Sequence, residues 1–318
     1  MLDLSIIVVS WNTKDLLLEC LASATNDCRR FKSEIIVVDN ASSDGSPEAV
    51  QDKYPNVKLI RNKKNLGFAK ANNVGIKHSI GRFICLLNSD IKIIDGCFMK
   101  MIVYMDGHPQ VGILGPKILS PNGVVQRSCM GYPTLWNSFS RALALDTLFP
   151  NIKFFGGYLM TYWGHDTLRS VDIINGCFWM IRRDALNHVG LLDENFFMYG
   201  EDIDWCRRFK EASWDVIFFP NAKAIHYGGA SSSKAPIKYY IEKRRSNLFY
   251  IKKYHGWFYL ILFTTLAFIH EILRFTGRAI RVSLKPSTRD QNMLKLKRSL
   301  AILRWLLKIK PKSDIIQI

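Results

Sequence analysis

Two short apolar runs near the N-terminus, separated by a segment with helical spacing, constrain the fold of this chain more than any other feature. The runs are Leu4–Ser10 and Glu34–Asp39, and both are rich in valine and isoleucine. Between them, apolar residues recur at helical intervals: Leu16, Leu17, Cys20, Leu21 and Ala24. Strands that are apolar without alternation are typical of parallel sheets covered by helices on both faces. The sequence therefore predicts an α/β fold that begins with a β-α-β unit.

Further elements follow in the order that such a fold requires. Asn12 or Thr13 is predicted to cap the first helix. The other predicted elements are helices near 48–53 and 68–79 and strands at 57–60, 82–88 and 214–219, the last ending before Pro220. Residues 120 to 175 show weak periodicity and predict only loops and short elements. In open α/β sheets ligands bind beyond the carboxyl ends of the strands, and Ser10, Asp39 and Asp90 all stand at such ends.

The positive charge of the chain is concentrated in its last quarter. The 318 residues have a formal net charge of +17, but residues 1–230 carry 25 basic and 23 acidic side chains, whereas residues 231–318 carry 19 and 4. Such asymmetry indicates a tail that meets an anionic surface, either phospholipid or nucleic acid. We place a domain boundary near residue 232, with an α/β domain at 1–232 and a basic, apolar helical region at 233–318.

The cysteines and the N-terminus indicate the compartment. Seven cysteines, none in a C-x-x-C arrangement, predict reduced core residues rather than disulfides or a thiolate metal site. The chain begins without the basic segment of a signal peptide, so we expect the catalytic part to face the cytosol.

Three polar segments are candidates for chemistry. Asp90, at a strand end after Asn88 and Ser89, suits a hard divalent cation that shares its remaining ligands with a diphosphate, although a turn-capping aspartate is the simpler interpretation. Glu201 and Asp202 follow a glycine and several aromatic residues. Aromatic surroundings raise the pKa of a carboxylate, as a general base requires. The alternative is that these acids only stabilise the first turn of a helix. A lone histidine is usually structural, but His226 is a competent ligand for Mn²⁺.

Three enzyme classes are disfavoured because their motifs are missing: classical dinucleotide enzymes, P-loop NTPases and serine hydrolases with a G-x-S-x-G motif. The chain has no G-x-G-x-x-G after its first strand, no G-x-x-x-x-G-K-[ST] and no G-x-S-x-G. An acidic sheet edge without a phosphate-binding glycine loop must neutralise phosphate in another way, and a metal ion is the natural one.

Five ordered segments together resemble the family 2 glycosyltransferases, and within them the rhamnosyltransferase-like branch that builds bacterial surface polysaccharides. The segments are Ile6–Asn12, Val37–Gly45, Asn65–Gly75, Leu87–Asp90 and Asp193–Asp204, within a match that covers residues 4 to 230. The resemblance implies a GT-A fold, a nucleotide-sugar donor, Mn²⁺ or Mg²⁺, and inversion at the anomeric carbon.

The resemblance also implies roles for individual residues. Those that match nucleotide-binding positions are Ser10, Asn12, Asp39, Asn65, Gly67, Asn88 and Ser89. Asp39 would accept from the imide N–H of uracil or thymine, Asp90 and His226 would bind the metal, and Asp202 would be the general base beside Glu201. Asn88 replaces an aspartate of the family's DXD motif, which leaves one fewer negative charge on the metal.

The tail predicts a membrane surface as its partner. Basic residues flank the uncharged run Trp257–Ile269, whose 13 residues are too few to span a bilayer alone, and the last segment is a basic amphipathic helix. A core helix packed on the catalytic domain is the alternative.

We therefore expect a peripheral enzyme on the cytoplasmic face of the membrane. It would transfer a sugar, with rhamnose as the candidate, from a dTDP- or UDP-sugar to a lipid-linked or polysaccharide acceptor. Two alternatives are a metal-dependent nucleotidyltransferase and a nucleic-acid-binding module that uses the basic tail; nucleic acid is not the expected partner, because its binding surfaces are more polar than this tail.

Overall fold

The computed structural model describes residues 2–229, 236–284 and 289–308, and the chain divides into two compact units. The first unit comprises Met1–Gly131 and Trp163–Lys234, and the second comprises Tyr132–Tyr162 and Ala235–Ile318. The predicted boundary at residue 232 lies outside the described residues. Assigning all of 1–232 to one domain is wrong for Tyr132–Tyr162, because a helix in this segment packs against the long helix that follows residue 235.

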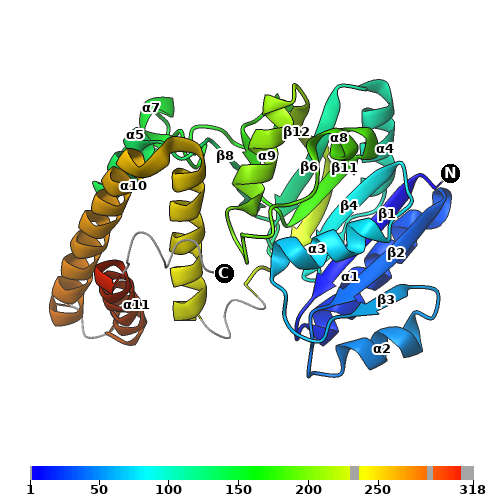
Figure 1. Ribbon diagram of the computed structural model, residues 1–318, viewed down its shortest axis with the longest axis horizontal. Helices are drawn as coiled ribbons and strands as arrows, with labels where there is room; N and C mark the ends of the chain where they lie inside the picture. Colours follow the sequence, from blue (N-terminus) through cyan, green and yellow to red (C-terminus); the bar gives the residue numbers. More distant parts are fainter. Residues whose placement is uncertain (1, 230–235, 285–288, 309–318) are drawn as a thin grey trace. The chain divides into compact units, whose positions relative to one another are not determined.

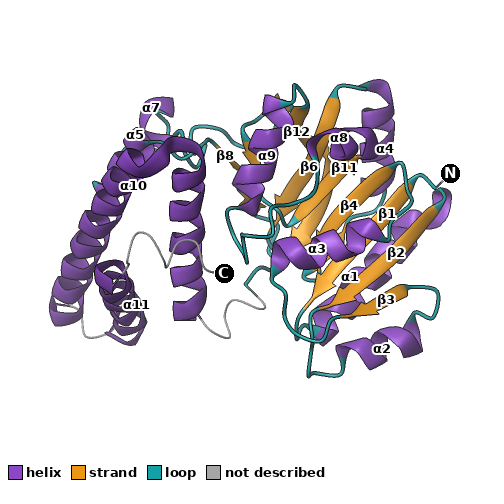
Figure 2. Ribbon diagram, in the orientation of Figure 1, coloured by secondary structure: helices purple, strands orange, loops and turns teal. Residues whose placement is uncertain are grey.

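A mixed, mostly parallel sheet forms the centre of the first unit (Figures 1 and 2). Its strands, in spatial order, are β3 (Lys58–Arg61), β2 (Ser33–Asp39), β1 (Leu4–Ser10), β4 (Phe83–Asn88), β11 (Phe178–Arg182), β6 (Val111–Leu119), β12 (Asp215–His226) and β5 (Ile91–Ile93). Strands β1 to β4 are parallel, β11 is antiparallel to both β4 and β6, and β12 is parallel to β6 and antiparallel to β5. This arrangement confirms the predicted fold class.

Helices cover both faces of this sheet, as continuously apolar strands require. The helices of the unit are α1 (Lys14–Asp27), α2 (Ser46–Lys53), α3 (Phe68–Lys77), α4 (Cys97–Gly107), α8 (Arg183–Val189) and α9 (Glu201–Glu211). Alternate residues of β1 serve opposite faces: Ile6 belongs to a core cluster with residues of α1 and α4, whereas Ile7 lies under α3. The close approach of α3 depends on Gly75, where a Cβ would lie 2.4 Å from the Ile7 side chain.

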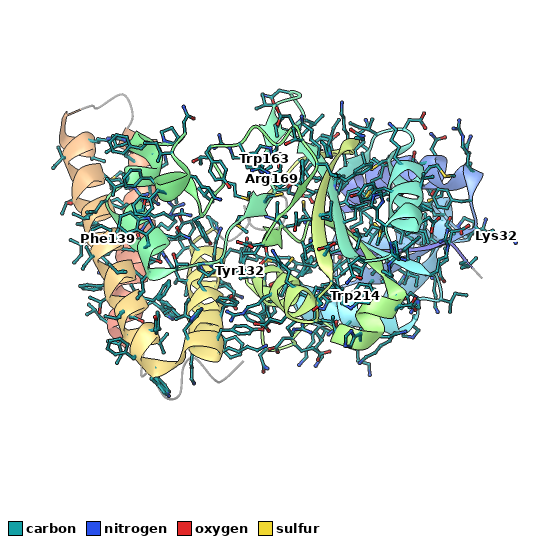
Figure 3. The ribbon with its side chains drawn as sticks, turned by 90° about the horizontal axis from the view of Figure 1, so that it is seen from above. Lys32, Tyr132, Phe139, Trp163, Arg169 and Trp214 are labelled. Atoms are coloured by element: carbon teal, nitrogen blue, oxygen red, sulfur yellow. The ribbon has the colours of Figure 1, made fainter. Side chains whose placement is uncertain are left out.

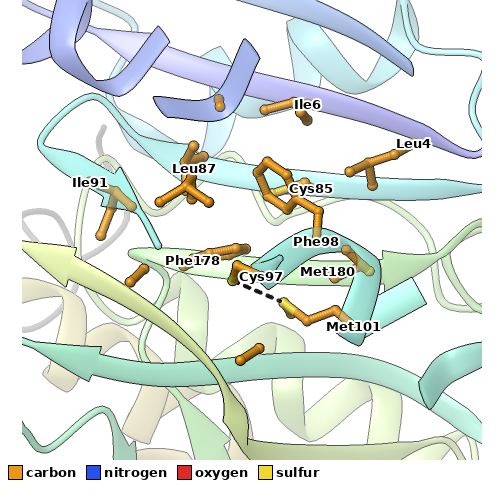
Figure 4. Packing of buried hydrophobic residues seen from close by; sticks show 14 of the residues in the cluster. Leu4, Ile6, Cys85, Leu87, Ile91, Cys97, Phe98, Met101, Phe178 and Met180 are labelled. Carbon is orange, nitrogen blue, oxygen red and sulfur yellow. Dashed lines mark hydrogen bonds between the residues drawn. The ribbon is translucent and has the colours of Figure 1, made fainter. Parts of the chain in front are cut away.

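The core on the α1 and α4 side is densely packed around aromatic and sulfur-containing side chains (Figure 4). Phe98 of α4 meets Phe178 of β11 edge to face, with ring centroids 5.8 Å apart, and the Cys97 thiol approaches the Met101 sulfur at 4.0 Å. All seven cysteines are buried and free, which confirms the expectation of core thiols without disulfides.

The late strand β12 is longer than the sequence predicts. It continues past Pro220 to His226, with a shift of register between Phe219 and Lys223. Proline cannot donate to a strand ladder, so an interruption at this point was expected, but a local irregularity absorbs it without ending the strand. His226 is therefore the last residue of β12, opposite Ile91 of β5, and does not stand in a loop beyond the strand.

Helices dominate the second unit. They are α5 (Leu135–Ala142), α6 (Leu145–Leu148), α7 (Lys153–Gly156), α10 (Pro236–Leu284) and α11 (Arg289–Lys308). Helix α10 is broken at Gly256, where φ is 78° and ψ is −172°, so it consists of two helical arms. Glu271 ties them together, because its carboxylate lies 2.7 Å from Arg244 of the other arm and accepts a hydrogen bond from Ser299 of α11.

One helix among the described residues, Pro236–Val282, is long and apolar enough to cross a membrane by length and composition. This finding qualifies the expectation from the 13-residue run alone, because residues flanking the run extend the apolar segment. Only 28% of its most apolar window is buried inside the protein.

Candidate active site

The carboxyl ends of β1, β2 and β4 meet at one edge of the sheet and bring Ser10, Asp39 and Asn88 into neighbouring positions. A chain of hydroxyls links the loops that leave this edge. The Thr13 hydroxyl lies 3.1 Å from the Ser10 hydroxyl and 2.8 Å from the Ser89 hydroxyl. Thr13 is the N-cap residue of α1, but its side chain makes no capping bond to the helix. Its sequence position predicted the cap but not this contact with Ser89.

Asp39 presents an acceptor that the protein leaves unused. The side chain is 3% exposed, and Oδ2 accepts a hydrogen bond from the Ser42 backbone N–H at 3.1 Å. Oδ1 is buried and has no hydrogen-bond partner among the described residues. Buried acceptors are normally paired, so this oxygen is suited to a donor brought by a ligand.

Asn12 shapes the loop beside Asp39. It has a left-handed backbone, with φ of 53°, a conformation that asparagine tolerates better than most residues. Its backbone N–H donates to the Ser42 hydroxyl, and its Oδ1 accepts from the Ser43 backbone N–H at 2.7 Å. These contacts give Asn12 a positioning role.

Asn65 and Gly67 belong to a network centred on Asn40, which sequence reasoning missed. The Asn40 amide donates to Asn65 Oδ1 and to the Gly67 carbonyl, and its oxygen accepts from the Leu66 N–H. Gly67 has φ of +81°, and a Cβ there would lie 2.3 Å from the Phe197 carbonyl oxygen. This close approach allows Phe68 N–H to donate to that carbonyl. The loop that leads to Glu201 and Asp202 is thereby fixed against the start of α3.

Asp90 and His226 lie together although 136 positions separate them in the sequence. His226 Nε2 is 3.3 Å from Asp90 Oδ1. Gln126, which sequence reasoning also missed, donates from its amide to the His226 carbonyl and faces His226 Nδ1 with its oxygen at 3.0 Å. An amide oxygen only accepts, so Nδ1 carries the hydrogen and Nε2 is directed at the carboxylate.

This pair fits a divalent cation. A carboxylate oxygen and an imidazole nitrogen at this separation need a proton or a metal ion between them, and the Gln126 contact is the kind of outer support that orients a metal-binding histidine. Within the described ranges no group of three or more His, Cys, Asp or Glu side chains could hold a metal ion. A cation bound by Asp90 and His226 would therefore take its other ligands from water and from oxygens of a bound phosphate.

The acids at the start of α9 have separate environments. Asp202 Oδ1 accepts from the Gly200 and Ile203 backbone N–H groups at 3.2 and 2.9 Å, an arrangement made possible by the left-handed backbone of Gly200. Asp204 is fully buried and lies 2.9 Å from Arg208, which also donates to carbonyls at 189 and 191. Asp204 is thus a structural residue, whereas Glu201 and Asp202 stand at the end of α9 that faces the loop fixed by Gly67.

Cys177 connects the two acidic groups. Burial, together with the negative charges of Asp90 and Asp202, raises the pKa of its thiol to about 12. Its carbonyl accepts from the Asn88 backbone N–H at 3.0 Å. Both carboxylates are therefore close enough to the Cys177 thiol to change its pKa.

The structure thus offers a buried carboxylate oxygen without a partner among the described residues at a strand end, a residue pair that fits a cation, and a separate carboxylate at the start of α9. Such a set fits an enzyme that transfers a group from a nucleoside diphosphate. Residues 5–190 match the model of glycosyl transferase family 2, and the chain belongs to this family. The resemblance drawn from the sequence motifs is confirmed, and neither the nucleotidyltransferase nor the nucleic-acid-binding alternative is favoured.

Named relatives cover most of the chain. It is 28% identical over 266 residues to the N-acetylglucosaminyl-diphospho-decaprenol L-rhamnosyltransferase of Mycobacterium tuberculosis, a match that covers 80% of this chain and 86% of that protein. It is 25% identical over 264 residues to the dTDP-rhamnosyl transferase RfbF of Shigella flexneri, covering 78% and 80% respectively.

Solved structures show the same fold. A mannosyltransferase from Pyrobaculum calidifontis, in complex with GDP-Man and Mn²⁺, aligns with a TM-score of 0.55 at 18% identity, over 98% of this chain and 90% of that one. Residues 1–349 of TarS from S. aureus align with a TM-score of 0.50, also at 18% identity, over 96% and 82%. These likenesses confirm the GT-A fold.

Proposed function

We propose that this glycosyltransferase moves a sugar, with rhamnose as the candidate, from a dTDP- or UDP-sugar to a lipid-linked or polysaccharide acceptor, with inversion at the anomeric carbon. The observation that carries the proposal is the Asp90–His226 pair, which lies just beyond the end of β4, with only β1 between β4 and the strand end where Asp39 Oδ1 has no partner among the described residues. The names of the two relatives, one with a diphospho-decaprenol acceptor and one with a dTDP-rhamnosyl group, support the choice of donor and acceptor.

Each residue has a defined part in this scheme. Asp39 Oδ1 accepts the imide N–H of the base, and the hydroxyls of Ser10 and Ser89, already linked through Thr13, face the rest of the nucleotide. Asn12, Asn65 and Gly67 hold the surrounding loops. Asp202 takes the proton of the acceptor hydroxyl as its oxygen attacks the anomeric carbon.

Asp90 and His226 would hold the Mn²⁺ or Mg²⁺ ion. When bound, such an ion neutralises the charge that develops on the departing diphosphate. Gln126 keeps His226 Nε2 directed at Asp90, and Asn88 fixes the strand end through its bond to the Cys177 carbonyl. Glu201, beside Asp202, adds negative charge next to the base.

We also propose that the second unit attaches the enzyme peripherally to the cytoplasmic face of the membrane. Its surface carries many exposed apolar side chains, including Phe139, Leu148, Phe149, Ile152 and Phe154 around α5 to α7 and Trp257, Phe258, Tyr259 and Ile261 after the Gly256 bend. Large exposed apolar areas combined with an excess of basic residues fit an anionic lipid surface better than nucleic acid.

A scan of nucleotide sugars tests the enzymatic proposal. The full chain is incubated with dTDP-rhamnose, other dTDP- and UDP-sugars and GDP-mannose, with and without Mn²⁺ or Mg²⁺, and release of the nucleoside diphosphate is measured. Metal-dependent release from a dTDP- or UDP-sugar is expected. Release from none of them, or from GDP-mannose alone, would refute the proposed donor.

A further inference from the structure

Three basic side chains of the first unit stand on β9 (Arg169–Ser170), on β6 or directly after β7 (Val125–Gln126), strands that adjoin β12 or one another, and none of them has a role in the scheme above. Lys117 lies near the end of β6, Arg127 directly follows the Gln126 that supports His226, and Arg169 begins β9. Among the residues that the structure describes, none of the three forms an ion pair with a carboxylate. Asp172, near Arg169 in sequence, pairs instead with Lys210 at 3.1 Å.

An aromatic platform supports this group. The Arg169 guanidinium lies over the Trp163 ring, 4.5 Å from its centroid, and the Trp163 ring also stacks on the His165 ring, with centroids 4.3 Å apart and 19° between the planes. Phe218 of β12 meets both rings edge to face. Trp163 and Arg169 appear side by side in Figure 3, far from Lys32 of the same unit.

Strand register brings the three cations together around the buried His165. Gln126, just before Arg127, pairs with Ile118, just after Lys117, and Arg169 pairs with Phe218, whose ring meets His165. His165 is 0% exposed, and its Nδ1 faces the Trp163 carbonyl oxygen at 3.2 Å, so Nδ1 is the donor nitrogen. Burial lowers the pKa of the imidazole, and the charges of Arg127, Arg169 and Lys117 lower it further, so all three cations act on this one ring.

We propose that Lys117, Arg127 and Arg169, around the His165 and Trp163 platform, bind the diphosphate of a lipid-linked acceptor. Cations without carboxylate partners are suited to an anion with several acceptor oxygens. The donor's diphosphate already has the Asp90–His226 pair to hold its counter-ion. The cations come from β6, the residue after β7 and β9. In the sheet, β4 and β11 separate β6 from β1 and β2, at whose ends the nucleoside is placed.

That this diphosphate belongs to the acceptor rests on the proposed function. The binding of a diphosphate to these three residues can nevertheless be measured without any sugar transfer. The probe is geranyl diphosphate, titrated calorimetrically into the full chain with saturating UDP and Mg²⁺, and geraniol is the matched uncharged ligand. The variants are Arg127→Gln and Lys117→Gln, with Lys32→Gln as a control that removes the same charge far from the cluster. Binding of UDP alone is measured in every variant.

We expect geranyl diphosphate to bind more tightly than geraniol. Arg127→Gln and Lys117→Gln should each weaken geranyl diphosphate binding by about tenfold or more, the usual effect of a lost hydrogen bond to a charged group, and leave UDP binding unchanged. Lys32→Gln should change neither. Equal binding of geraniol and geranyl diphosphate, or unchanged binding in both variants, would overturn the inference.

A loss confined to UDP binding would also overturn it, because the cluster would then serve the donor. A chain that binds geranyl diphosphate through this cluster but uses no nucleotide sugar would instead refute the proposed function and leave the site standing.

Discussion

Replacing Asp39 by asparagine is the sharpest test of the nucleoside pocket. Asp39 Oδ2 accepts from the Ser42 N–H, so in the variant the amide oxygen must stay there and the NH₂ group must take the place of the unpartnered Oδ1. A donor would then face the imide N–H of the base. Losing a hydrogen bond to a charged group costs about 1.5–3 kcal/mol, which corresponds to roughly 10- to 150-fold weaker binding of UDP or dTDP.

The assay is calorimetric titration of UDP and dTDP into the full chain with Mg²⁺, together with a thermal melt. Asp44→Asn is the matched control, because it removes the same charge from the same loop, but the Asp44 carboxylate is occupied by Lys14 N–H and by Ser46. Asp39→Asn should weaken nucleotide binding without lowering Tm, since it removes a buried, half-satisfied carboxylate. Equal nucleotide affinity in Asp39→Asn and in the unaltered protein would refute the base-recognition role.

Three further predictions follow from the same geometry. Asp90→Ala should abolish Mn²⁺- or Mg²⁺-dependent turnover of the sugar nucleotide without unfolding the protein, and His226→Ala should lower this turnover less. If a metal titration finds most of the rate retained in Asp90→Ala, the cation site is contradicted. Gly67→Ala should lower both Tm and activity, because its Cβ would lie 2.3 Å from the Phe197 oxygen. Its control, Gly96→Ala, has a similar φ of +74° with only the Lys100 side chain nearby, and should cost just the backbone strain of about 1–3 kcal/mol. Equal decreases of Tm in the two variants would argue against the Gly67 contact. Phe258→Asp, at a side chain 70% exposed, should weaken binding to anionic vesicles at least tenfold, and Ile80→Asp, at a side chain 65% exposed in the first unit, should not; equal vesicle binding by both variants would refute membrane contact at Phe258.

Local sequence patterns predicted the first four strands and the start of β12, but not β5, β6 or β11. The apolar run at Leu4–Ser10 is bounded by polar residues, and the strand has the same limits in the structure. The pairing of Asp204 with Arg208 was also accessible, since residues four apart on a helix face each other. Asp90 and Asp202 were identified from their motifs, and their shared proximity to Cys177 agrees with one site.

Contacts between distant segments could not be predicted in this way. Gln126 reaches His226 only because β7, β6 and β12 are adjacent in the sheet, and no local pattern contains that register. The Tyr132–Tyr162 segment has weak periodicity because its short helices are stabilised by α10, which begins about a hundred residues later. Pro220 predicted a strand end. In the structure β12 continues past the irregularity because it pairs with β6 on one side and β5 on the other.

The central claim is that Asp202 is the base of a sugar transfer from a nucleotide donor. Steady-state kinetics of Asp202→Asn with the donor found in the nucleotide-sugar scan tests it most directly, because the amide keeps the side-chain shape and the bonds from the Gly200 and Ile203 N–H groups but cannot take a proton. We expect kcat to fall by about 10² to 10⁴ while the donor's KM and the affinity for its nucleoside diphosphate stay unchanged. An Asp202→Asn enzyme that keeps its kcat and loses donor affinity would contradict the account.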